Sequence, residues 1–302
     1  MKPLKAWRDE AEFFSAHGWR IASWVTTNPD PDAPWLLLIH GFPTSSWDWS
    51  AVWPAISARF NLAAADMLGF GLSDKPSNIK YSIDAQADLQ EAMLEQLGVG
   101  EAHVFAHDYG DTVAQELLAR HNEGALSFSL KSVCFLNGGL FPEQHRPRLI
   151  QKIGLSPLGG LLGLMMSRDT LRKNFDQIFG ENTKASDEEI DGHWELLVEN
   201  DGSKIFHKLL HYMPERKIHR ERWVGALKNA RIPLRLINGG QDPVSGRHLY
   251  DHYRQELADA DAVLLDNIGH YPHTEAPDQV ASAFLDFHHK LSFSQRTIKN
   301  GE

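Results

Sequence analysis

The most informative part of the sequence is Val104-Phe105-Ala106-His107-Asp108-Tyr109-Gly110, an apolar run that ends in a turn of small residues. The residues that follow, 111–118, carry apolar side chains at helical spacing. Small residues two positions before and two after the centre of such a turn, here Ala106 and Gly110, allow a strained bend that exposes the central side chain. The sequence therefore predicts that a strand, a sharp turn and a helix meet at Asp108, with its carboxylate in the open.

The aspartate at this turn determines which chemistry is available. A carboxylate with a reference pKa of about 3.9 is ionised at neutral pH, so Asp108 can attack a carbon atom without a general base. Attack on the saturated carbon of an alkyl halide or an epoxide gives an ester of the protein, which water must then hydrolyse with the help of a base. The alternative interpretation is that Asp108 only caps the following helix, where aspartate is favoured. Whether Asp108 is a nucleophile or only a helix cap depends on whether other parts of the chain supply a base and an acid for the reaction.

Length, charge and cysteine content narrow the class of protein. A chain of 302 residues with 42% hydrophobic residues is long enough for one α/β domain that carries an insertion. The net charge of −10, without a dense run of Lys and Arg, argues against nucleic acid or an anionic membrane as the main partner. The single cysteine, Cys134, cannot form an internal disulfide, which predicts a reducing, cytoplasmic location. The basic first residues are not followed by an apolar run and do not resemble a secretory signal.

Predicted strands and helices alternate over most of the chain. A hairpin is expected from the apolar segments 13–14 and 19–27, which flank His17-Gly18. Further strands are predicted at 35–39, 61–65, 103–107, 131–136, 232–237 and 262–265, and helices at 47–59, 82–97, 109–121, 247–257 and 279–290. This alternation predicts an α/β fold in which helices cover both faces of a parallel sheet.

The alternation stops between about Leu140 and Val224, where only helical patterns interrupted by Pro and Gly occur. We interpret this segment as an inserted helical lid. It divides the chain into a first core part at 1–139, a helical cap at 140–224 and a second core part at 225–302. The least polar stretch of the segment, Leu155 to Met166, is too short to cross a bilayer, and we interpret it as part of the lid or its hinge.

Polar residues that directly follow strands are the candidates for a site, because ligands bind beyond the carboxyl ends of the strands in an open parallel sheet. These candidates are the loop His40–Ser46, Asp108, Asp242 and His270. Their order along the chain is that of a nucleophile, an acid and a histidine, and Asp242 is placed to hold the Nδ1 proton of His270. The alternatives are a surface histidine and a turn-forming aspartate, with Asp251 and Asp266 as weaker candidates for the acid.

Two backbone amides complete the predicted site as an oxyanion hole. The N–H groups of Phe42 and Tyr109 are placed to bind the charged oxygen of the tetrahedral intermediate in the second step. Each such donor typically stabilises the charge of the transition state by about 3 kcal/mol. The alternative is that the turn Gly41–Pro43 is an ordinary end of a strand.

At these residues the chain resembles α/β-hydrolases with an aspartate nucleophile, the group of epoxide hydrolases and haloalkane dehalogenases. Within this group it looks like the mesoderm-specific transcript protein family, in the runs His40–Ser46, Asp74–Pro76, His107–Asp111, Val113–Leu118, Asn137–Glu143 and Arg222–Leu227. The likeness extends from about Pro34 to the final helix. It implies the α/β-hydrolase fold, with a mostly parallel eight-stranded sheet, helices on both faces and an inserted helical cap.

The resemblance to epoxide hydrolases suggests a further site residue. Those enzymes use tyrosines of the lid to hydrogen-bond the epoxide oxygen and protonate the departing alkoxide. Tyr212 lies where the second of these tyrosines would fall, before the pair Arg222-Trp223. The segment 174–180 offers no counterpart of the first tyrosine, and packing of the lid is the alternative role of Tyr212.

The resemblance to haloalkane dehalogenases is weaker at two positions. Those enzymes usually place Trp after the nucleophile to hold the halide, and many place Asn after the His-Gly pair, where this chain has Tyr109 and Phe42. Trp47, Trp194 or Asn137 could line a halide site instead, with core packing as the alternative for the two Trp. His40, which opens the loop after its strand, is included as a further substrate contact.

The sequence predicts neither a metal nor a cofactor. His207 and His211 share a helix face, but Lys208 stands where a zinc protease motif needs Glu. We therefore expect a hydrolase that acts on a small molecule with water, and we favour an epoxide over a haloalkane as substrate. A carboxylester or lactone hydrolase and a non-catalytic binding protein on the same scaffold remain alternatives, and a homodimer is left open.

Overall fold

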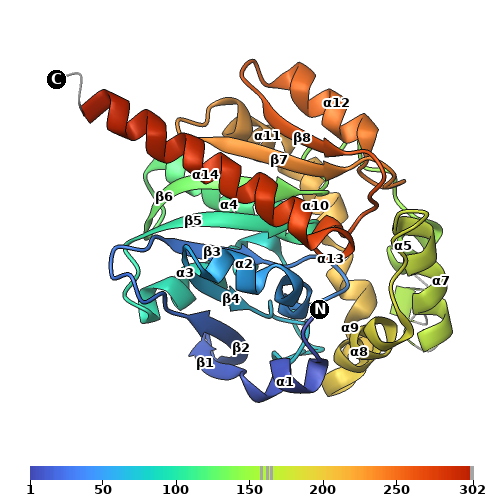
Figure 1. Cartoon of the computed structure of the whole chain (residues 1–302). Coiled ribbons are helices and arrows are strands. Elements are labelled where there is room, and N and C mark those ends of the chain that lie inside the picture. The colour runs from blue at the N-terminus through green and yellow to red at the C-terminus, as the bar shows by residue number, and fades with distance from the viewer. Residues whose placement is uncertain (157–158, 161–162, 164–165, 300–302) are drawn as a thin grey trace.

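One sheet of eight strands runs through the part of the chain that the structure describes (Figure 1). This computed structural model describes residues 1–156, 159–160, 163 and 166–299. The strand order in the sheet is β1-β2-β4-β3-β5-β6-β7-β8. The strands are β1 Glu12–Ala16, β2 Trp19–Thr26, β3 Trp35–Ile39, β4 Asn61–Ala65, β5 Glu101–His107, β6 Ser129–Leu136, β7 Leu234–Gly239 and β8 Asp261–Leu265.

The sheet is parallel except at one edge. Strand β2 pairs antiparallel with both β1 and β4, whereas all pairs from β4 to β8 are parallel. The mostly parallel, eight-stranded sheet expected of the α/β-hydrolase fold is thereby confirmed. Strand β5 lies between β3 and β6, so the turn at Asp108 lies in the middle of the edge at which the parallel strands end.

Helices connect the strands and cover the sheet (Figure 1). Outside the segment between β6 and β7, they are α1 Leu4–Asp9, a 3-10 helix at Ser46–Ala51, α2 Trp53–Ser57, α3 Ile83–Gln96, α4 Tyr109–Glu123, α12 Arg247–Glu256, α13 Pro272–Glu275 and α14 Pro277–Lys299. Their ends follow local sequence signals. The Ser82 side chain accepts a hydrogen bond from the amide of Ala85 at the start of α3, and Gly124 ends α4 with a φ of 70°, a conformation that glycine adopts without strain.

Side chains of each strand alternate between two helical layers. In β3, Leu36 and Leu38 join a buried cluster with residues of α2 and α14. Leu37 and Ile39 join the larger cluster on the opposite face, with residues of α3, α4 and α12. Burial on both faces explains why this strand is a continuous apolar run in the sequence.

The single helix predicted at 47–59 is instead divided into the 3-10 helix Ser46–Ala51 and α2. Pro54 lies in the first turn of α2. Because proline has no N–H group, it cannot continue the hydrogen-bond ladder of a helix that began before it. The prediction of one helix was therefore wrong at this position.

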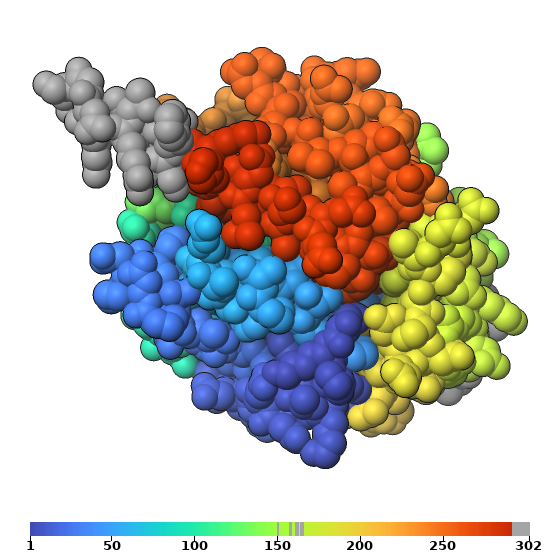
Figure 2. All heavy atoms as spheres, viewed as in Figure 1, coloured from blue at the N-terminus to red at the C-terminus, as the bar shows by residue number. Residues whose placement is uncertain are grey.

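Only helices occur among the described residues between β6 and β7. They are α5 Leu149–Gly154, α7 Arg168–Ile178, α8 Asp187–Val198, a 3-10 helix at Glu199–Asp201, α9 Gly202–Leu209, α10 Tyr212–Ile218 and α11 Arg220–Lys228. Figure 2 shows the yellow residues of this segment packed against both the N-terminal and the C-terminal parts of the chain. Part of the stretch 155–166, interpreted as a lid hinge, lies outside the described residues, at 157–158, 161–162 and 164–165.

Among the described residues, none of the helices has both the length and the apolar character that crossing a bilayer requires.

Candidate active site

Asp108 lies at a sharp turn between β5 and α4. Its φ of 49° and ψ of −105° are unusual for a residue with a side chain and are associated with local strain. The turn depends on close backbone contacts, because a Cβ atom at Gly110 would lie 2.5 Å from the carbonyl oxygen of Ile39. A Cβ at Gly41 would lie 2.9 Å from the Cβ of Asp108. Both glycines are therefore required by the packing of the two loops.

The Asp108 carboxylate is held by a backbone amide. The N–H of Phe42 donates a hydrogen bond of 3.0 Å to Asp108 Oδ1, as expected for one of the two predicted oxyanion donors. Tyr109 is the first residue of α4, and amides in a first helical turn have no acceptor within the helix. Both predicted amides therefore lie beside the carboxylate of the turn.

His270 connects this carboxylate to Asp242. Its Nδ1 lies 2.7 Å from Asp242 Oδ2, and its Nε2 lies 3.6 Å from Asp108 Oδ2. All three side chains are buried. The structure thus brings together the three residues that the sequence analysis proposed, from the loops that follow β5, β7 and β8.

Asp242 is fixed by several donors besides His270. Its Oδ1 accepts from the amide of Val244 at 2.7 Å. Its Oδ2 accepts from the Ser245 hydroxyl at 2.8 Å and from Asn137 Nδ2 at 3.0 Å. A carboxylate with this many donors stays ionised and does not rotate away from the imidazole.

Charge and burial act in opposite directions on these groups. Burial alone would lower the pKa of His270, but the negative charges of Asp242 and Asp108 raise it to about 10. Burial would raise the pKa of Asp108, yet the positive charges of nearby His270 and Arg216 hold it well below its ordinary value. At neutral pH the site therefore contains an imidazolium between two carboxylates.

Arg216 is a functional candidate that the sequence analysis did not identify. Its guanidinium is buried, and it donates to Thr112 Oγ1 at 2.6 Å and to the carbonyl oxygen of Asp108 at 3.1 Å. It thereby fixes the backbone of the turn from α10. Its signal in the sequence is weak, because nothing in a single arginine of a helical segment indicates such a partner.

A cavity of about 70 Å³ lies beside the turn. Asp108 and His270 form part of its wall. The rest of the wall is mainly apolar and includes Phe42, Leu171, Phe175, Ile178, Phe206 and Val244. The residues of α7 and Phe206 come from the segment between β6 and β7, so that segment forms a large part of the cavity wall next to the carboxylate.

Tyr212 does not line this cavity among the residues described. It is buried, its ring lies 4.7 Å from that of Tyr109 and 6.2 Å from that of Phe42, and its hydroxyl has no hydrogen-bond partner. Burial is the main reason that its pKa is raised, followed by the charge of Asp108. Tyr212 is therefore a buried donor beside the residue that follows the nucleophile.

Three predicted substrate contacts do not line the described cavity, and for each the structure shows another role. Both ring nitrogens of His40 have backbone partners, the carbonyl of Gly41 and the amide of Met67, each at 2.9 Å. The indole N–H of Trp47 donates to the carbonyl of Lys2 at 2.8 Å. Asn137 holds Asp242, as described above. The polar atoms of these side chains are thus bonded to protein groups, and their contact with the substrate stays a prediction that the lining of this cavity does not support.

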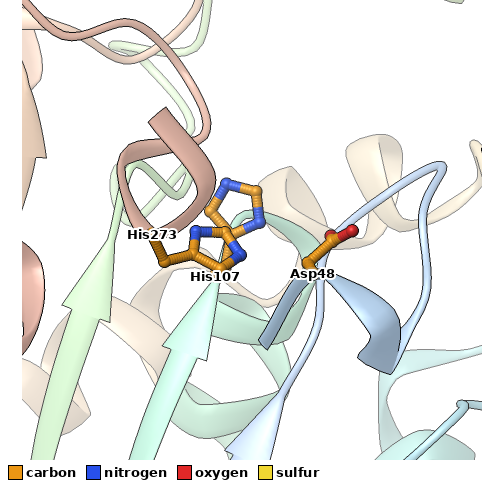
Figure 3. Close-up of side chains that lie close together, drawn as sticks. All are labelled: Asp48, His107 and His273. Atoms are coloured by element: carbon orange, nitrogen blue, oxygen red, sulfur yellow. The ribbon is translucent and has the colours of Figure 1, made fainter. Parts of the chain in front are cut away.

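A second buried polar cluster lies next to the turn. It consists of Asp48, His107 and His273, whose side chains lie close together (Figure 3). Among the described residues, these three could hold a metal ion. No side chain of this cluster lines the cavity at Asp108.

Comparison with known proteins gives a consistent result. A family model for the α/β hydrolase fold matches residues 34–277. The chain is 38% identical to the human mesoderm-specific transcript homolog protein over 94% of this chain and 87% of that protein. It is also 38% identical to LipZ of Mycobacterium tuberculosis, over 93% of this chain and 96% of that protein.

Solved structures share the same fold at low sequence identity. A loop variant of the haloalkane dehalogenase DbeA from Bradyrhizobium elkanii superposes with a TM-score of 0.76 at 21% identity, covering 95% of this chain and 99% of that one. The epoxide hydrolase CorEH superposes with a TM-score of 0.74 at 19% identity, covering 93% of this chain and 99% of that one. At such identities the likeness is one of fold.

Proposed function

The chain belongs to the α/β-hydrolase family, and on this premise we propose that it hydrolyses a small, mainly apolar molecule through an ester formed on Asp108. One observation carries the proposal. The Asp108 carboxylate lies at the wall of an apolar cavity, 3.6 Å from an imidazole that is itself anchored by Asp242 at 2.7 Å. This arrangement supplies a nucleophile, a base and the group that orients the base.

In the first step, Asp108 Oδ2 attacks a saturated carbon atom of the substrate. The carbon–oxygen bond of the ester forms while the bond from that carbon to the leaving group breaks. For an epoxide, the leaving group is an alkoxide on the same molecule. Its proton comes from the Tyr212 hydroxyl, which lies behind Phe42 of the cavity wall and must reach the alkoxide past that ring. A buried hydroxyl without a protein partner is the kind of donor that this step needs.

In the second step, water attacks the carbonyl carbon of the ester. Esterification removes the negative charge of Asp108, which is one of the charges that raise the pKa of His270. The imidazole then loses its proton more readily and accepts one from the attacking water, while Asp242 stabilises the resulting imidazolium. The amides of Phe42 and Tyr109 hold the charged oxygen of the intermediate. When the intermediate collapses, the bond from its central carbon to the substrate oxygen breaks, and the imidazolium gives its proton to that oxygen, so that the product alcohol and the Asp108 carboxyl group are released.

An epoxide is the favoured substrate class. The position after the nucleophile carries Tyr109 and the position after His40-Gly41 carries Phe42, so the two side-chain donors that usually bind a halide are absent from those positions. The Tyr212 hydroxyl instead offers a proton to an oxygen leaving group. We also propose that the segment 140–224 acts as the cap that determines which substrates reach Asp108, because α7 and Phe206 line the cavity.

The test is a panel of substrates combined with trapping of the ester. Purified protein is assayed with styrene oxide, 1,2-dibromoethane and p-nitrophenyl esters, and the His270→Gln variant is analysed by mass spectrometry after exposure to each. An adduct on the peptide that contains Asp108, formed with styrene oxide and absent in Asp108→Ala, is the expected result. Turnover of the p-nitrophenyl esters alone would favour an ester hydrolase. No turnover and no adduct with any of the three would favour a binding protein.

A further inference from the structure

The cluster of Asp48, His107 and His273 brings together three segments that are distant in the sequence. Asp48 lies in the 3-10 helix after β3, His107 is the last residue of β5, and His273 lies in α13. Each side chain is fully buried. One ligand atom from each residue lies within 4.8 Å of those of the other two, and Figure 3 shows the two imidazoles next to each other with the Asp48 side chain beside them.

The protonation of His107 is fixed by its neighbour. Its Nε2 lies 2.8 Å from the backbone carbonyl oxygen of His270. A carbonyl can only accept, so Nε2 carries the proton and Nδ1 presents a lone pair. That Nδ1 has no hydrogen-bond partner among the described residues, so its lone pair is not compensated by a donor among them.

Asp48 and His273 add further unpaired atoms. The Thr44 hydroxyl donates to Asp48 Oδ2, but Asp48 Oδ1 has no hydrogen-bond partner among the residues described. The same is true of both ring nitrogens of His273, and in its neutral form one of these nitrogens is also an acceptor. Leaving a buried polar atom unpaired is destabilising by about 1–3 kcal/mol, so three converging acceptors require a common partner.

A cation meets this requirement better than water or a proton does. A water molecule has only two hydrogens for three acceptors, and it leaves the charge of the buried carboxylate uncompensated. A single proton on Asp48 pairs with only one imidazole. Two imidazoles and one carboxylate are, in contrast, a ligand set that suits zinc.

We propose that Asp48 Oδ1, His107 Nδ1 and one ring nitrogen of His273 bind a zinc ion. Another buried nitrogen, His193 Nδ1, lies 3.8 Å from Asp48 Oδ1 and also has no hydrogen-bond partner among the described residues. Three protein ligands leave the fourth position of a tetrahedral zinc to a water molecule, or to His193 after a movement of its side chain. This inference is independent of the hydrolytic function proposed above.

The position of the site indicates what it does. His107 directly precedes Asp108 in the chain, and His273 follows His270 by three residues. His193 belongs to α8, within the segment that covers the cavity. The ion therefore connects the strand before the nucleophile, the 3-10 helix after β3 and the helix that follows the catalytic histidine, and it lies beside His193 of the covering segment. None of its ligands lines the cavity, so it positions these segments and does not touch the substrate.

The test measures metal content and stability of the whole chain. Protein refolded from denaturant with Zn²⁺, and then passed through a chelating resin, is analysed for bound metal by inductively coupled plasma mass spectrometry. One zinc per chain is expected, together with a Tm several degrees above that of protein refolded with a chelator. Asp48→Asn and His273→Ala should lose the zinc and the rise in Tm, whereas His121→Ala, a change on α4 away from the cluster, should keep both.

Spectroscopy on the unmodified chain covers the case in which the variants do not fold. Refolding with Co²⁺ should produce the intense visible absorption of a tetrahedral cobalt site, and X-ray absorption of the zinc form should show a first shell of nitrogen and oxygen. Refolding without stoichiometric metal, or a six-coordinate cobalt spectrum, would overturn the proposal in favour of a network of protons and waters. Zinc retained equally in both cluster variants would place the metal elsewhere and overturn it as well.

Discussion

His270 Nε2 lies 3.6 Å from Asp108 Oδ2, which is longer than a hydrogen bond. The other nitrogen of the same ring is held at 2.7 Å by Asp242. The imidazole is therefore anchored on the acid and only approaches the nucleophile. This asymmetry suits a histidine whose proposed partner is a water molecule and not the carboxylate itself.

Replacement of His270 by Gln should separate the two chemical steps. Glutamine cannot accept a proton from water, so turnover should fall by about 10²–10⁴-fold, while attack by Asp108 continues. Rapid mixing with styrene oxide, followed by intact-mass analysis, should show one stoichiometric adduct. The variant Asp108→Ala serves as the control, and an adduct that persists in it would show that the modified residue is a different one.

Replacement of Asp242 by Asn should slow mainly the second step. The imidazolium that forms during water attack would lose its counter-charge, and a loss of about 10²–10⁴-fold in the hydrolysis of the ester is expected. Single-turnover kinetics measure this step directly. Asp266→Asn provides a matched control, because its carboxylate pairs with exposed Arg247. Equal effects of the two variants would argue against Asp242 as the acid of the triad.

Replacement of Tyr212 by Phe should distinguish an oxygen leaving group from a halide. Because the hydroxyl makes no hydrogen bond to any described residue, its removal should change the free energy of unfolding by less than about 1 kcal/mol. Ring opening of styrene oxide should nevertheless slow by at least about tenfold, whereas displacement of bromide from 1,2-dibromoethane should not change. If both reactions are unaffected, Tyr212 only packs the lid.

Glu116 should make a contribution to stability that depends on pH. Its buried carboxylate accepts from Arg222 at 2.7 Å and from the indole of Trp223 at 2.8 Å, which attaches α11 to α4. Burial alone would raise the pKa of Glu116, but these donors and Arg120 lower it below the ordinary value of 4.5. A carboxylate whose pKa is lowered by folding stabilises the protein above its ordinary pKa, and this stabilisation is lost as the pH falls through the folded value.

The variant Glu116→Gln tests whether the stabilisation by Glu116 is lost as the pH falls. It should lower the free energy of unfolding by about 1–3 kcal/mol at neutral pH, and the difference from the unmodified chain should shrink below the ordinary glutamate pKa. Urea denaturation at several pH values gives both quantities. Glu123→Gln, which removes an exposed partner of the same Arg222, should have little effect. A difference that grows on acidification would contradict the assignment.

Replacement of Gly110 by Ala should disrupt the turn that presents Asp108. The added Cβ would lie 2.5 Å from the carbonyl oxygen of Ile39, so β3 and α4 must separate, and a loss of at least about 2 kcal/mol is expected. Gly100→Ala is the control, since nothing lies within 4 Å of its added Cβ. Thermal denaturation of the two variants makes the comparison, and equal Tm values would show that the turn tolerates a side chain.

The fold was predictable because its physical requirements repeat along the chain. A strand buried on both faces must be apolar throughout, as Trp35–Ile39 is, and strands that alternate with helices must pair in parallel. The candidates Asp108, Asp242 and His270 were found for the same reason, since the ends of parallel strands meet at one edge of the sheet. Each of these inferences needs only local patterns and one topological rule.

The roles of single polar side chains were less predictable. His40, Trp47 and Asn137 were expected to contact the substrate, but their hydrogen bonds go to Met67, Lys2 and Asp242. Arg216 was not anticipated, although it holds the backbone of the turn. Whether a polar side chain faces a cavity or a backbone group depends on rotations and packing distances that leave no periodic trace in the sequence.

The sequence by itself determined the layered architecture, the sharp turn at an aspartate and the loops from which an acid and a histidine approach it. Only the tertiary structure decided which polar groups become neighbours, including the cluster of Asp48, His107 and His273. The reason is physical. Burial and periodicity act on neighbours along the chain, whereas the distance between a carboxylate and an imidazole from separate segments is set by how all the intervening elements pack.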